Sequence, residues 1–314
     1  MPTLREILDV VESLWPVDGA ESWDSVGLVS GDPSATVEHI HLAVDAVPDT
    51  AREATILGAD LLLVHHPLLL RGVTTIAETT YKGAVLATLV RGGCALVAAH
   101  TNADVMTTGT SAVLADAIGL TEQRPLEPGA RPGAGIGRVG VLPAPVPLGL
   151  LARRIADVLP PTASGVRVSG EYDRPVRTVA LCAGAGDAYL RNPDVLAADV
   201  YVTSDLRHHP ASEFREQARL LDGPALVDTS HWATEWLWLD VAATQLRAAT
   251  GARVTVSDLR TDPWDFAVLP SSSVPDAGAP SSASERAVDA AVPASERAVD
   301  ATPRPETPSQ GASA

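Results

Sequence analysis

The chain has 314 residues, of which 46% are hydrophobic and 20% charged, and its formal net charge is −16. A chain of this length and composition can form a large globular core in one or two domains. The excess of negative charge argues against a nucleic-acid backbone or an anionic membrane as the main partner.

The amino terminus predicts an amphipathic helix, because apolar residues recur at helical spacing from Leu4 to Trp15. It lacks the pattern of a signal peptide, and no stretch of the chain approaches the roughly 18 apolar residues of a membrane span. Cys94 and Cys182 each lie inside an apolar run, which indicates small buried side chains rather than a disulfide or metal ligands. These features predict a cytoplasmic protein.

Strands and helices alternate along most of the chain. After a short strand within residues 21–33, strands are expected at residues 41–47, 61–64 and 94–99, and helices at residues 50–57, 82–91 and 111–118. Residues 121–147 are rich in glycine and proline and predict only one strand, at residues 138–142. Further strands are expected at residues 166–169, 178–182, 200–203, 225–228 and 253–257, and helices at residues 148–159, 188–196, 211–221 and 231–249.

This alternation predicts an α/β fold built from βαβ units. We expect two three-layer α/β halves with mixed sheets, at residues 1–124 and 125–268, and a site in the cleft between them. Residues 270–314 contain no Leu, Ile, Met or aromatic residue, and 27 of these 45 residues are Ala, Ser or Pro. Residues 269–314 are therefore predicted to form a disordered tail without a catalytic role.

The predicted strand at residues 61–64 ends in His65, His66 and Pro67. In an open α/β sheet, the loops beyond the carboxyl ends of the strands hold the functional groups, and imidazole is the commonest metal ligand among side chains. Adjacent residues that leave a strand point to opposite sides. We therefore expect His65 and His66 to serve two neighbouring metal ions rather than one.

Two further clusters follow predicted strands. His100 and Asp104 lie just beyond residues 94–99, where Asp104 is a candidate ligand and His100 either binds a metal or orients a ligand. His231 and Glu235 fall one helical turn apart at the start of a predicted helix, where they can hold one metal or bridge two. Taken alone, each cluster is more often an ordinary capping or surface pair. Their common position at strand ends favours a shared site.

Three other stretches carry polar or glycine-rich patterns. Residues 201–210 place Asp205, His208 and His209 after a strand, where we expect them to line the site. Residues 182–187 form a turn of small residues whose N–H groups can receive a phosphate, although tight packing explains the glycines equally well. Residues 135–140 match a dinucleotide-binding pattern in form only, because they precede a strand instead of following one.

Five motifs together resemble the Nif-three-like family, whose members are commonly labelled dinuclear metal-centre hexameric proteins or GTP cyclohydrolase 1 type 2 homologues. The motifs occur in order at residues 21–28 (ESWDSVGL), 60–67 (DLLLVHHP), 100–104 (HTNAD), 203–206 (TSDL) and 231–235 (HWATE). The resemblance covers roughly residues 1–268. It departs from the family pattern at Ser204, where a glycine is expected. The number of residues between Asp104 and His231 matches the family members that lack an additional inserted domain.

The resemblance implies two similar α/β halves and a toroidal homohexamer whose sites face an internal cavity. It also implies that two divalent ions are held by five residues, which are His65, His66, Asp104, His231 and Glu235. Glu235 would bridge the ions, His65 and His231 would bind one, and His66 and Asp104 the other. Oxygen and nitrogen ligands without thiolate suit Zn²⁺, Mn²⁺, Fe or Ni²⁺, and Mg²⁺ is not excluded. His100 and Asp205 are candidates for orienting these ligands.

Two functions fit these expectations. The first is a metal-dependent hydrolase of a nucleotide or another phosphorylated small molecule, because a pair of cations can activate water at neutral pH and stabilise the charge of the transition state. The cyclohydrolase label of the family agrees with this hypothesis. The alternative is a metal-binding regulatory or scaffold protein without catalytic activity. Neither hypothesis involves a membrane or a nucleic acid.

Overall fold

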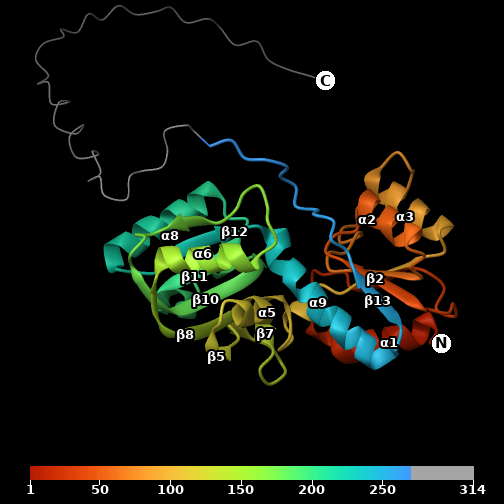
Figure 1. Ribbon diagram of the computed structural model, residues 1–314, viewed down its shortest axis with the longest axis horizontal. Coiled ribbons are helices and arrows are strands. Elements are labelled where there is room, and N and C mark those ends of the chain that lie inside the picture. Colours follow the sequence, from red (N-terminus) through yellow and green to blue (C-terminus); the bar gives the residue numbers. More distant parts are fainter. Residues whose placement is uncertain (270–314) are drawn as a thin grey trace, which may run out of the picture. The chain divides into compact units, whose positions relative to one another are not determined.

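The computed structural model describes residues 1–269 and contains two mixed β-sheets in an α/β arrangement (Figure 1). The predicted fold class is confirmed at this level. The first sheet has the order β1-β4-β3-β2-β13, in which only β1 runs antiparallel to its neighbour. Its strands are β1 (Gly27–Ser30), β2 (His39–Ala43), β3 (Leu61–Val64), β4 (Ala95–Ala98) and β13 (Arg253–Val256).

The second sheet has the order β5-β8-β10-β11-β12-β9. Three of its strands, β10, β11 and β12, run parallel to one another, and the others are antiparallel to their neighbours. Its strands are β5 (Thr121–Arg124), β8 (Arg138–Pro147), β9 (Arg167–Ser169), β10 (Pro175–Ala185), β11 (Val200–Ser204) and β12 (Ala225–Thr229).

Residues 121–147 contain more strands than the single one predicted. In addition to β8, β5 lies at the edge of the second sheet, and β6 (Glu127–Pro128) pairs with β7 (Gly135–Ile136) in a two-stranded ribbon. β5 has the sequence TEQR and is largely exposed, and β6 and β7 have only two residues each. None of them carries the apolar alternation by which a strand is recognised in a sequence.

Helices cover both faces of each sheet. They are α1 (Leu4–Leu14), α2 (Pro48–Ile56), α3 (Tyr81–Arg91), α4 (Thr101–Asp104), α5 (Thr110–Ala117), α6 (Leu148–Val158), α7 (Pro193–Ala197), α8 (His208–Leu221) and α9 (His231–Thr250). The chain also forms short 3₁₀ turns at Val17–Gly19 and Asp187–Tyr189. None of the helices within residues 1–269 is long and apolar enough to cross a membrane.

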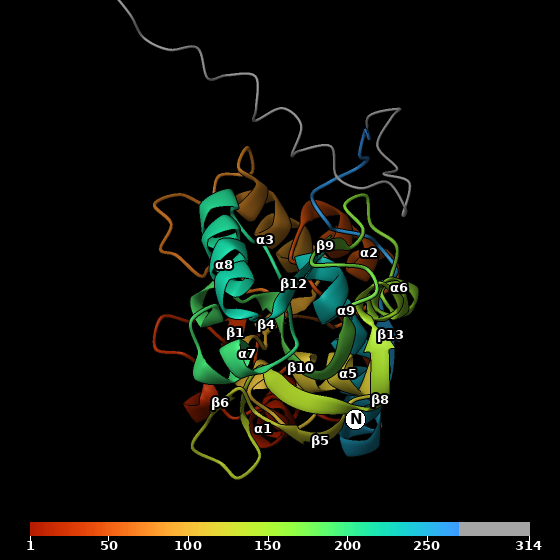
Figure 2. The same cartoon turned by 90° about the vertical axis from the view of Figure 1, so that its left-hand side faces the viewer.

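Alternate residues of each strand define the two faces of a sheet. In β3, Leu61 and Leu63 pack in the same core as α1 and α9, whereas Leu62 packs in the core beneath α2 and α3. In the second sheet, α6 packs with Val200 on one face and α8 packs with Tyr201 on the other. Figure 2 shows α6 and α8 on opposite sides of this sheet. Both sheets are therefore buried on two faces, as in other three-layer α/β folds.

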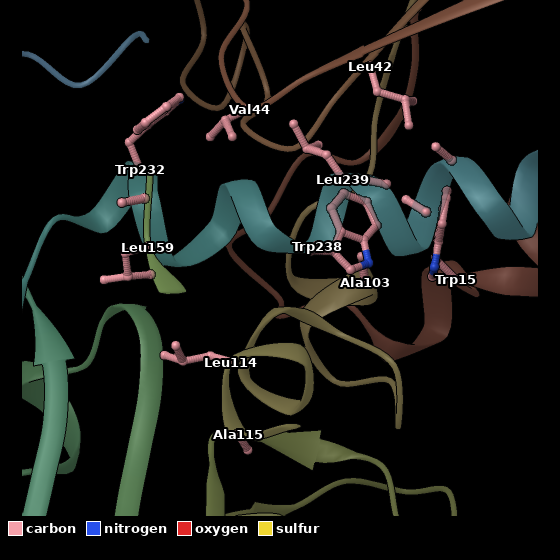
Figure 3. Packing of buried hydrophobic residues seen from close by; sticks show 14 of the residues in the cluster. Trp15, Leu42, Val44, Ala103, Leu114, Ala115, Leu159, Trp232, Trp238 and Leu239 are labelled. Carbon is pink, nitrogen blue, oxygen red and sulfur yellow. The ribbon is translucent and has the colours of Figure 1, made fainter. Parts of the chain in front are cut away.

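The long helix α9 belongs to the core of both sheets. Its buried side chains, including Trp238 and Leu239, pack in one continuous cluster with Trp15 of the α1 region and Leu114 of α5 (Figure 3). Trp15 and Trp238 meet edge to face with 5.1 Å between their ring centroids. A helix that buries residues around most of its circumference must be covered on several sides.

The two sheets exchange strands across the predicted boundary between residues 124 and 125. β5, at the end of the first predicted half, pairs with β8 of the second sheet. β13, near the end of the second predicted half, pairs with β2 of the first sheet. Residues 1–267 form a single compact unit. The division into two halves stays a prediction, and the predicted tail lies outside the described residues except for Leu269.

The predicted helix at residues 188–196 is the least accurate of the helical predictions. The chain forms the 3₁₀ turn Asp187–Tyr189 there, followed by the short helix α7. α7 begins after Asn192, whose side chain accepts a hydrogen bond from the N–H of Asp194, and has Pro193 in its first turn. Asn followed by Pro is a typical start of a helix, so the first residue of α7 could have been predicted from the sequence.

Candidate metal centre

His65 and His66 follow the carboxyl end of β3, which ends at Val64. Their backbone N–H groups donate to the carbonyls of Ala43 and Val44, at 3.1 and 2.8 Å. Both imidazoles face the same group of polar side chains, with 5.1 Å between their ring centroids. The expectation that they point to opposite sides is wrong, because the strand conformation that produces this alternation ends before His65.

His231 and Glu235 occupy the first turns of α9. The side chain of Ser230 caps this helix by accepting a hydrogen bond from the N–H of Ala233. The helical spacing brings Nε2 of His231 within 2.9 Å of Oε1 of Glu235, and the other carboxylate oxygen lies 2.8 Å from Nε2 of His66. Residues that follow β3 of the first sheet therefore meet residues that follow β12 of the second.

Asp104 lies on the His65 side of this cluster. Its Oδ1 is 3.5 Å from Nε2 of His65 and accepts a hydrogen bond from the hydroxyl of Thr110 at 2.5 Å. On the other side, the Nε2 atoms of His66 and His231 are 3.3 Å apart. These two distances join His65 to Asp104 and His66 to His231. The contacts of Glu235 instead join His65 with His231, as the resemblance implied, because both lie near its Oε1, at 3.7 and 2.9 Å, whereas Oε2 lies near His66. The assignment of His65 and His231 to one ion and of His66 and Asp104 to the other stays a prediction.

The four histidines at this site share one hydrogen-bonding pattern, in which Nδ1 points away from the cluster. The acceptors of Nδ1 are the Ala99 carbonyl for His65 at 2.9 Å, Asp45 for His66 at 2.7 Å, Asp205 for His231 at 2.7 Å and Asp24 for His100 at 2.9 Å. Because these partners only accept, each Nδ1 must carry the proton. A neutral imidazole then presents the lone pair of Nε2, as in metal-bound histidines with an outer carboxylate or carbonyl.

Two buried atoms of the cluster have no hydrogen-bond partner among the described residues. They are Nε2 of His65 and Oε2 of Glu235. Although Oε2 lies close to His66, that contact lacks the geometry of a hydrogen bond. Buried polar atoms are normally paired, and ligand atoms that share one tetrahedral ion at 2.0–2.2 Å lie roughly 3.3–3.5 Å apart. The unpaired buried atoms and the distances between the ligand atoms therefore both fit a divalent cation.

Two overlapping sets of residues bring their ligand atoms within 4.8 Å of one another. One set is His65, His66 and His100, and the other is His66, His231 and Glu235. The two sets share His66, and each of them could hold a metal ion. The first set offers only nitrogen donors and the second offers nitrogen and oxygen donors, and both kinds suit borderline divalent ions.

The buried carboxylate of Glu235 is held in its ionised form. Burial raises the pKa of Glu235, but the imidazoles of His231, His66 and His65 outweigh burial and keep the pKa well below its usual range. Burial lowers the pKa of His66, yet the carboxylates of Glu235 and Asp45 raise it to about 10. A buried anion of this kind is stabilised only by a nearby cation, either a proton on imidazole or a metal ion.

Gly184, near the end of β10, gives Glu235 its space. A Cβ atom at Gly184 would lie 2.3 Å from Oε1 of Glu235 and 3.2 Å from Nε2 of His231. The N–H of Gly184 donates to the Thr234 hydroxyl at 3.0 Å, so it is not free to receive a phosphate. Of the two interpretations of residues 182–187, tight packing is therefore the one that the structure supports.

We expect Gly184→Ala to weaken metal binding about tenfold or more, because the methyl group must displace the Glu235 carboxylate. Elemental analysis after dialysis against a defined metal concentration measures the loss. Gly58→Ala is the matched control, since Gly58 has the same left-handed backbone (φ +64° against +69°) but nothing within 4 Å of its added Cβ. Equal metal content in the two variants would contradict the role of Gly184.

His100 lies beside the cluster and is held by a residue that the sequence analysis did not single out. Its ring centroid is 5.1 Å from that of His65 and 5.8 Å from that of Trp23. Asp24, whose side chain is fully buried, accepts hydrogen bonds from His100 and from the N–H and hydroxyl of Thr101. These hydrogen bonds outweigh burial, so the pKa of Asp24 is far below its usual range.

Asp45, which was not predicted, and the predicted site-lining residues Asp205 and His208 occupy distinct places. Asp45 follows β2 and orients His66, but the predicted strand at residues 41–47 concealed it. Asp205 has a left-handed backbone (φ 59°) and orients His231, while Ser204 remains in the extended strand β11. His208 instead lines a separate pocket with Arg167 and Asp228.

The cluster opens into a cavity of about 1,070 Å³. Its walls include Trp23, His66, Asp104, Tyr189, His231 and Glu235. Trp23 is 57% exposed, so one face of its indole is available to a ligand. The cavity is large enough for a small organic substrate to reach the imidazoles and carboxylates.

Residues 2–263 match the Duf34/NIF3 (NGG1p interacting factor 3) family. The chain belongs to this family. A Streptomyces coelicolor relative, named GTP cyclohydrolase 1 type 2 homolog, is 45% identical over 292 residues, which cover 90% of this chain and all of the relative. The resemblance inferred from the five motifs is therefore confirmed.

Other relatives match most of this chain, and one of them has a solved structure. A Mycobacterium tuberculosis relative with the same name is 35% identical, over 84% of this chain and 97% of its own length. That alignment spans 374 positions, more than this chain has residues, so the mycobacterial relative carries insertions that this chain lacks. The structure of a Bacillus cereus protein related to NIF3 superposes with a TM-score of 0.76 at 23% identity and covers 85% of this chain and 99% of its own. This likeness shows the fold.

Proposed function

We propose that this Duf34/NIF3 protein holds two divalent metal ions in a cleft between two similar α/β halves, and that it is a hydrolase of a nucleotide or another phosphorylated small molecule. One observation carries the proposal. Imidazoles and carboxylates from both sheets converge, the outer nitrogen atoms of the imidazoles are already hydrogen-bonded, and two inner atoms, Nε2 of His65 and Oε2 of Glu235, have no hydrogen-bond partner among the described residues. This is the arrangement of a prepared metal site.

Five residues would hold the ions, namely His65, His66, Asp104, His231 and Glu235. The resemblance assigns His65 and His231 to one ion and His66 and Asp104 to the other, and the contacts of the two Glu235 oxygens support this assignment. Glu235 would serve both ions, because its Oε1 lies 2.9 Å from His231 and 3.7 Å from His65, whereas its Oε2 lies 2.8 Å from His66. Its complete burial between the other ligands suits a bridging carboxylate.

When bound, two divalent ions would lower the pKa of water and neutralise charge that develops during hydrolysis. The side chains of the protein hold the imidazoles of the site in fixed orientations. Asp24 and Asp205 fix the orientation of His100 and His231, so that neither imidazole has to reorganise during the reaction. The partly exposed rings of His66 and His231 face the cavity, where a substrate can reach them.

The donor set favours Zn²⁺, Mn²⁺, Fe or Ni²⁺, with Mg²⁺ as a weaker candidate. Cys182 also lines the cavity, but burial raises the pKa of its thiol to about 12. A thiol with such a pKa stays protonated at neutral pH and is a poor metal ligand. We therefore propose a site made only of nitrogen and oxygen donors.

The cavity supports a nucleotide-sized substrate. Its volume of about 1,070 Å³ exceeds that of a phosphate alone, and the half-exposed indole of Trp23 lies next to His100 and can stack on a planar base. Relatives of this chain are named GTP cyclohydrolase 1 type 2 homolog. GTP is therefore the first substrate to test, followed by other nucleotides and simple phosphoesters.

The test of this proposal is a substrate screen with purified protein that has been reconstituted with each divalent metal. We expect turnover of at least one nucleotide or phosphoester, and its loss by at least two orders of magnitude in His65→Ala, because removal of a ligand disrupts the centre. His208→Ala, in a separate pocket, is the control and should retain full activity. Turnover that survives in His65→Ala would refute the assignment of the active site.

One observation favours the alternative, a metal-binding regulatory or scaffold protein. Glu21 and Glu127 also line the cavity and add negative charge opposite the metal ligands. Acidic walls attract cations and repel phosphorylated substrates. Stoichiometric metal uptake without turnover of any substrate in the screen would support this second function.

The homohexamer implied by the family resemblance is also a proposal. Six chains of 32.6 kDa would give a particle of about 196 kDa, which multi-angle light scattering distinguishes from smaller assemblies.

A further inference from the structure

The chain continues past β13 into an irregular segment that returns to the metal centre. We call residues 258–264 the C-terminal strap. Its start is fixed by Ser257, whose N–H donates to the Leu42 carbonyl and whose hydroxyl donates to Glu53. The strap then extends toward the amino-terminal end of α9 and makes one hydrogen bond to each side of the metal centre.

The first of these hydrogen bonds supports His66. The hydroxyl of Thr261 donates to Oδ2 of Asp45 at 2.5 Å, and Oδ1 of the same carboxylate accepts the N–H of His66 at 2.7 Å. Among the described residues, Thr261 is the only hydrogen-bond donor to Oδ2. Thr261 therefore fixes the plane of the carboxylate that in turn fixes the imidazole.

The second hydrogen bond supports the start of α9. The hydroxyl of Ser230 donates to Oδ1 of Asp262 at 2.6 Å, and both side chains are buried. Ser230 is the residue that caps α9, and His231 follows it directly. Oδ2 of Asp262 accepts a hydrogen bond from the N–H of Trp264 at 3.3 Å, and this hydrogen bond lies within the C-terminal strap.

These two contacts act on imidazoles that come from different parts of the fold. His66 follows β3 of the first sheet, whereas His231 begins the helix that follows β12 of the second. Their Nε2 atoms are 3.3 Å apart, and both belong to one set of ligand atoms that lie within 4.8 Å of one another. The C-terminal strap is hydrogen-bonded on both sides of this pair, to Asp45 behind His66 and to Ser230 before His231.

We propose that the C-terminal strap is a positioning element of the metal centre, in which Thr261 acts through Asp45 on His66 and Asp262 acts through Ser230 on His231. This inference rests on the proposed metal binding. Metal sites require their ligands to be held within about 0.5 Å, and loss of an outer partner typically weakens metal binding 10- to 100-fold. The strap places two such outer contacts on residues about 200 positions away from Asp45 in the sequence.

The decisive comparison is between Thr261→Val and Thr261→Ser in the full-length protein. Thr261→Val keeps the shape of the side chain but removes the hydroxyl, and we expect it to weaken the binding of one metal ion about tenfold. Thr261→Ser restores the hydroxyl and should restore the affinity. Competition with a chromophoric chelator measures the affinity, and the visible spectrum of the Co²⁺-loaded protein should change with the altered imidazole geometry.

A control separates positioning from stability. Thr255 on β13 also bonds to two histidines, His39 at 2.7 Å and His41 at 2.8 Å, but neither histidine belongs to the metal centre. Thr255→Val should lower the thermal stability and leave the metal affinity and Co²⁺ spectrum unchanged. A loss of affinity in Thr255→Val equal to that in Thr261→Val would overturn the proposal.

Asp262→Ala provides an independent test on the other side of the centre, and it replaces Thr261→Val if that variant does not fold. We expect a loss of about tenfold in metal affinity while the Ser230 cap remains. Wild-type affinity in both strap variants, with two ions bound, would refute the strap but leave the proposed function intact. A wild-type protein that takes up no metal would refute the proposed function itself.

Discussion

Glu235→Gln is expected to lose at least one of the two metal ions. The substitution preserves the size of the side chain but replaces a buried anion by a neutral amide. An amide offers a metal one oxygen atom, whereas a carboxylate offers two. Since Glu235 touches His66 and His231 and lies 3.7 Å from His65, both ions would lose a ligand at once. Elemental analysis of dialysed protein would show a metal content of one or fewer ions per chain.

Glu53→Gln is the matched control for this experiment. Glu53 is also a partly buried carboxylate that contacts a histidine, His41, at 3.0 Å, but it lies outside the cavity. We expect Glu53→Gln to keep the full metal content, because the amide oxygen can still accept the hydrogen bond from Ser257 at the start of the C-terminal strap. If Glu235→Gln retains two ions per chain, the bridging role of Glu235 is wrong, and the centre must be assigned to the imidazoles and Asp104.

Strand ends were the sequence feature that located the site. The apolar runs before His65, Asp104 and His231 are recognisable as buried strands, and the polar residues that follow them meet in space because carboxyl ends of strands carry functional loops. Asp45 would also have been recognised as a residue at a strand end if the predicted strand had ended at Ala43 instead of Val47. A boundary error of four residues was enough to conceal it.

Other parts of the site depend on tertiary structure that no local pattern encodes. Asp24, Thr261 and Asp262 lie in irregular segments, so their approach to His100, Asp45 and Ser230 follows from the path of the whole chain. The pairing of β13 with β2 is of the same kind, because it requires the preceding helix α9 to run back along the first sheet. Local propensity predicts that these elements exist but not which neighbours they acquire.

The grouping of ligands shows a similar limit. The adjacent histidines suggested two neighbouring ions because their side chains were expected to point to opposite sides, but both rings face the same cluster. Beyond the end of a strand the direction of a side chain is set by backbone turns and by outer hydrogen bonds. Here Ala99 and Asp45 set those directions, and neither contact could be inferred from spacing.

The core and the metal centre meet at Trp238, and its removal should therefore affect both. Trp238 is fully buried, packs edge to face on Trp15, and its ring centroid lies 5.3 Å from that of His65. Truncation of a buried tryptophan to alanine costs about 3–5 kcal/mol, because the cavity that remains is only partly filled by relaxation. Trp238→Ala should lower the free energy of unfolding by this amount and should also leave His65 loosely held, with weaker metal binding.

Trp238→Phe distinguishes packing from polarity at this position. The indole N–H of Trp238 has no hydrogen-bond partner among the described residues, so replacing it with a ring that lacks this donor removes a buried unpaired group while keeping most of the packing. We expect a loss of only about 1 kcal/mol in denaturant unfolding and a metal content close to wild type. Trp23→Ala is the control for the loss of an indole at an exposed position. Because Trp23 is 57% exposed, we expect it to change the free energy of unfolding by about 0.5 kcal/mol or less. Equal losses in Trp238→Phe and Trp238→Ala would show that the indole itself, rather than the space it fills, holds His65 in place.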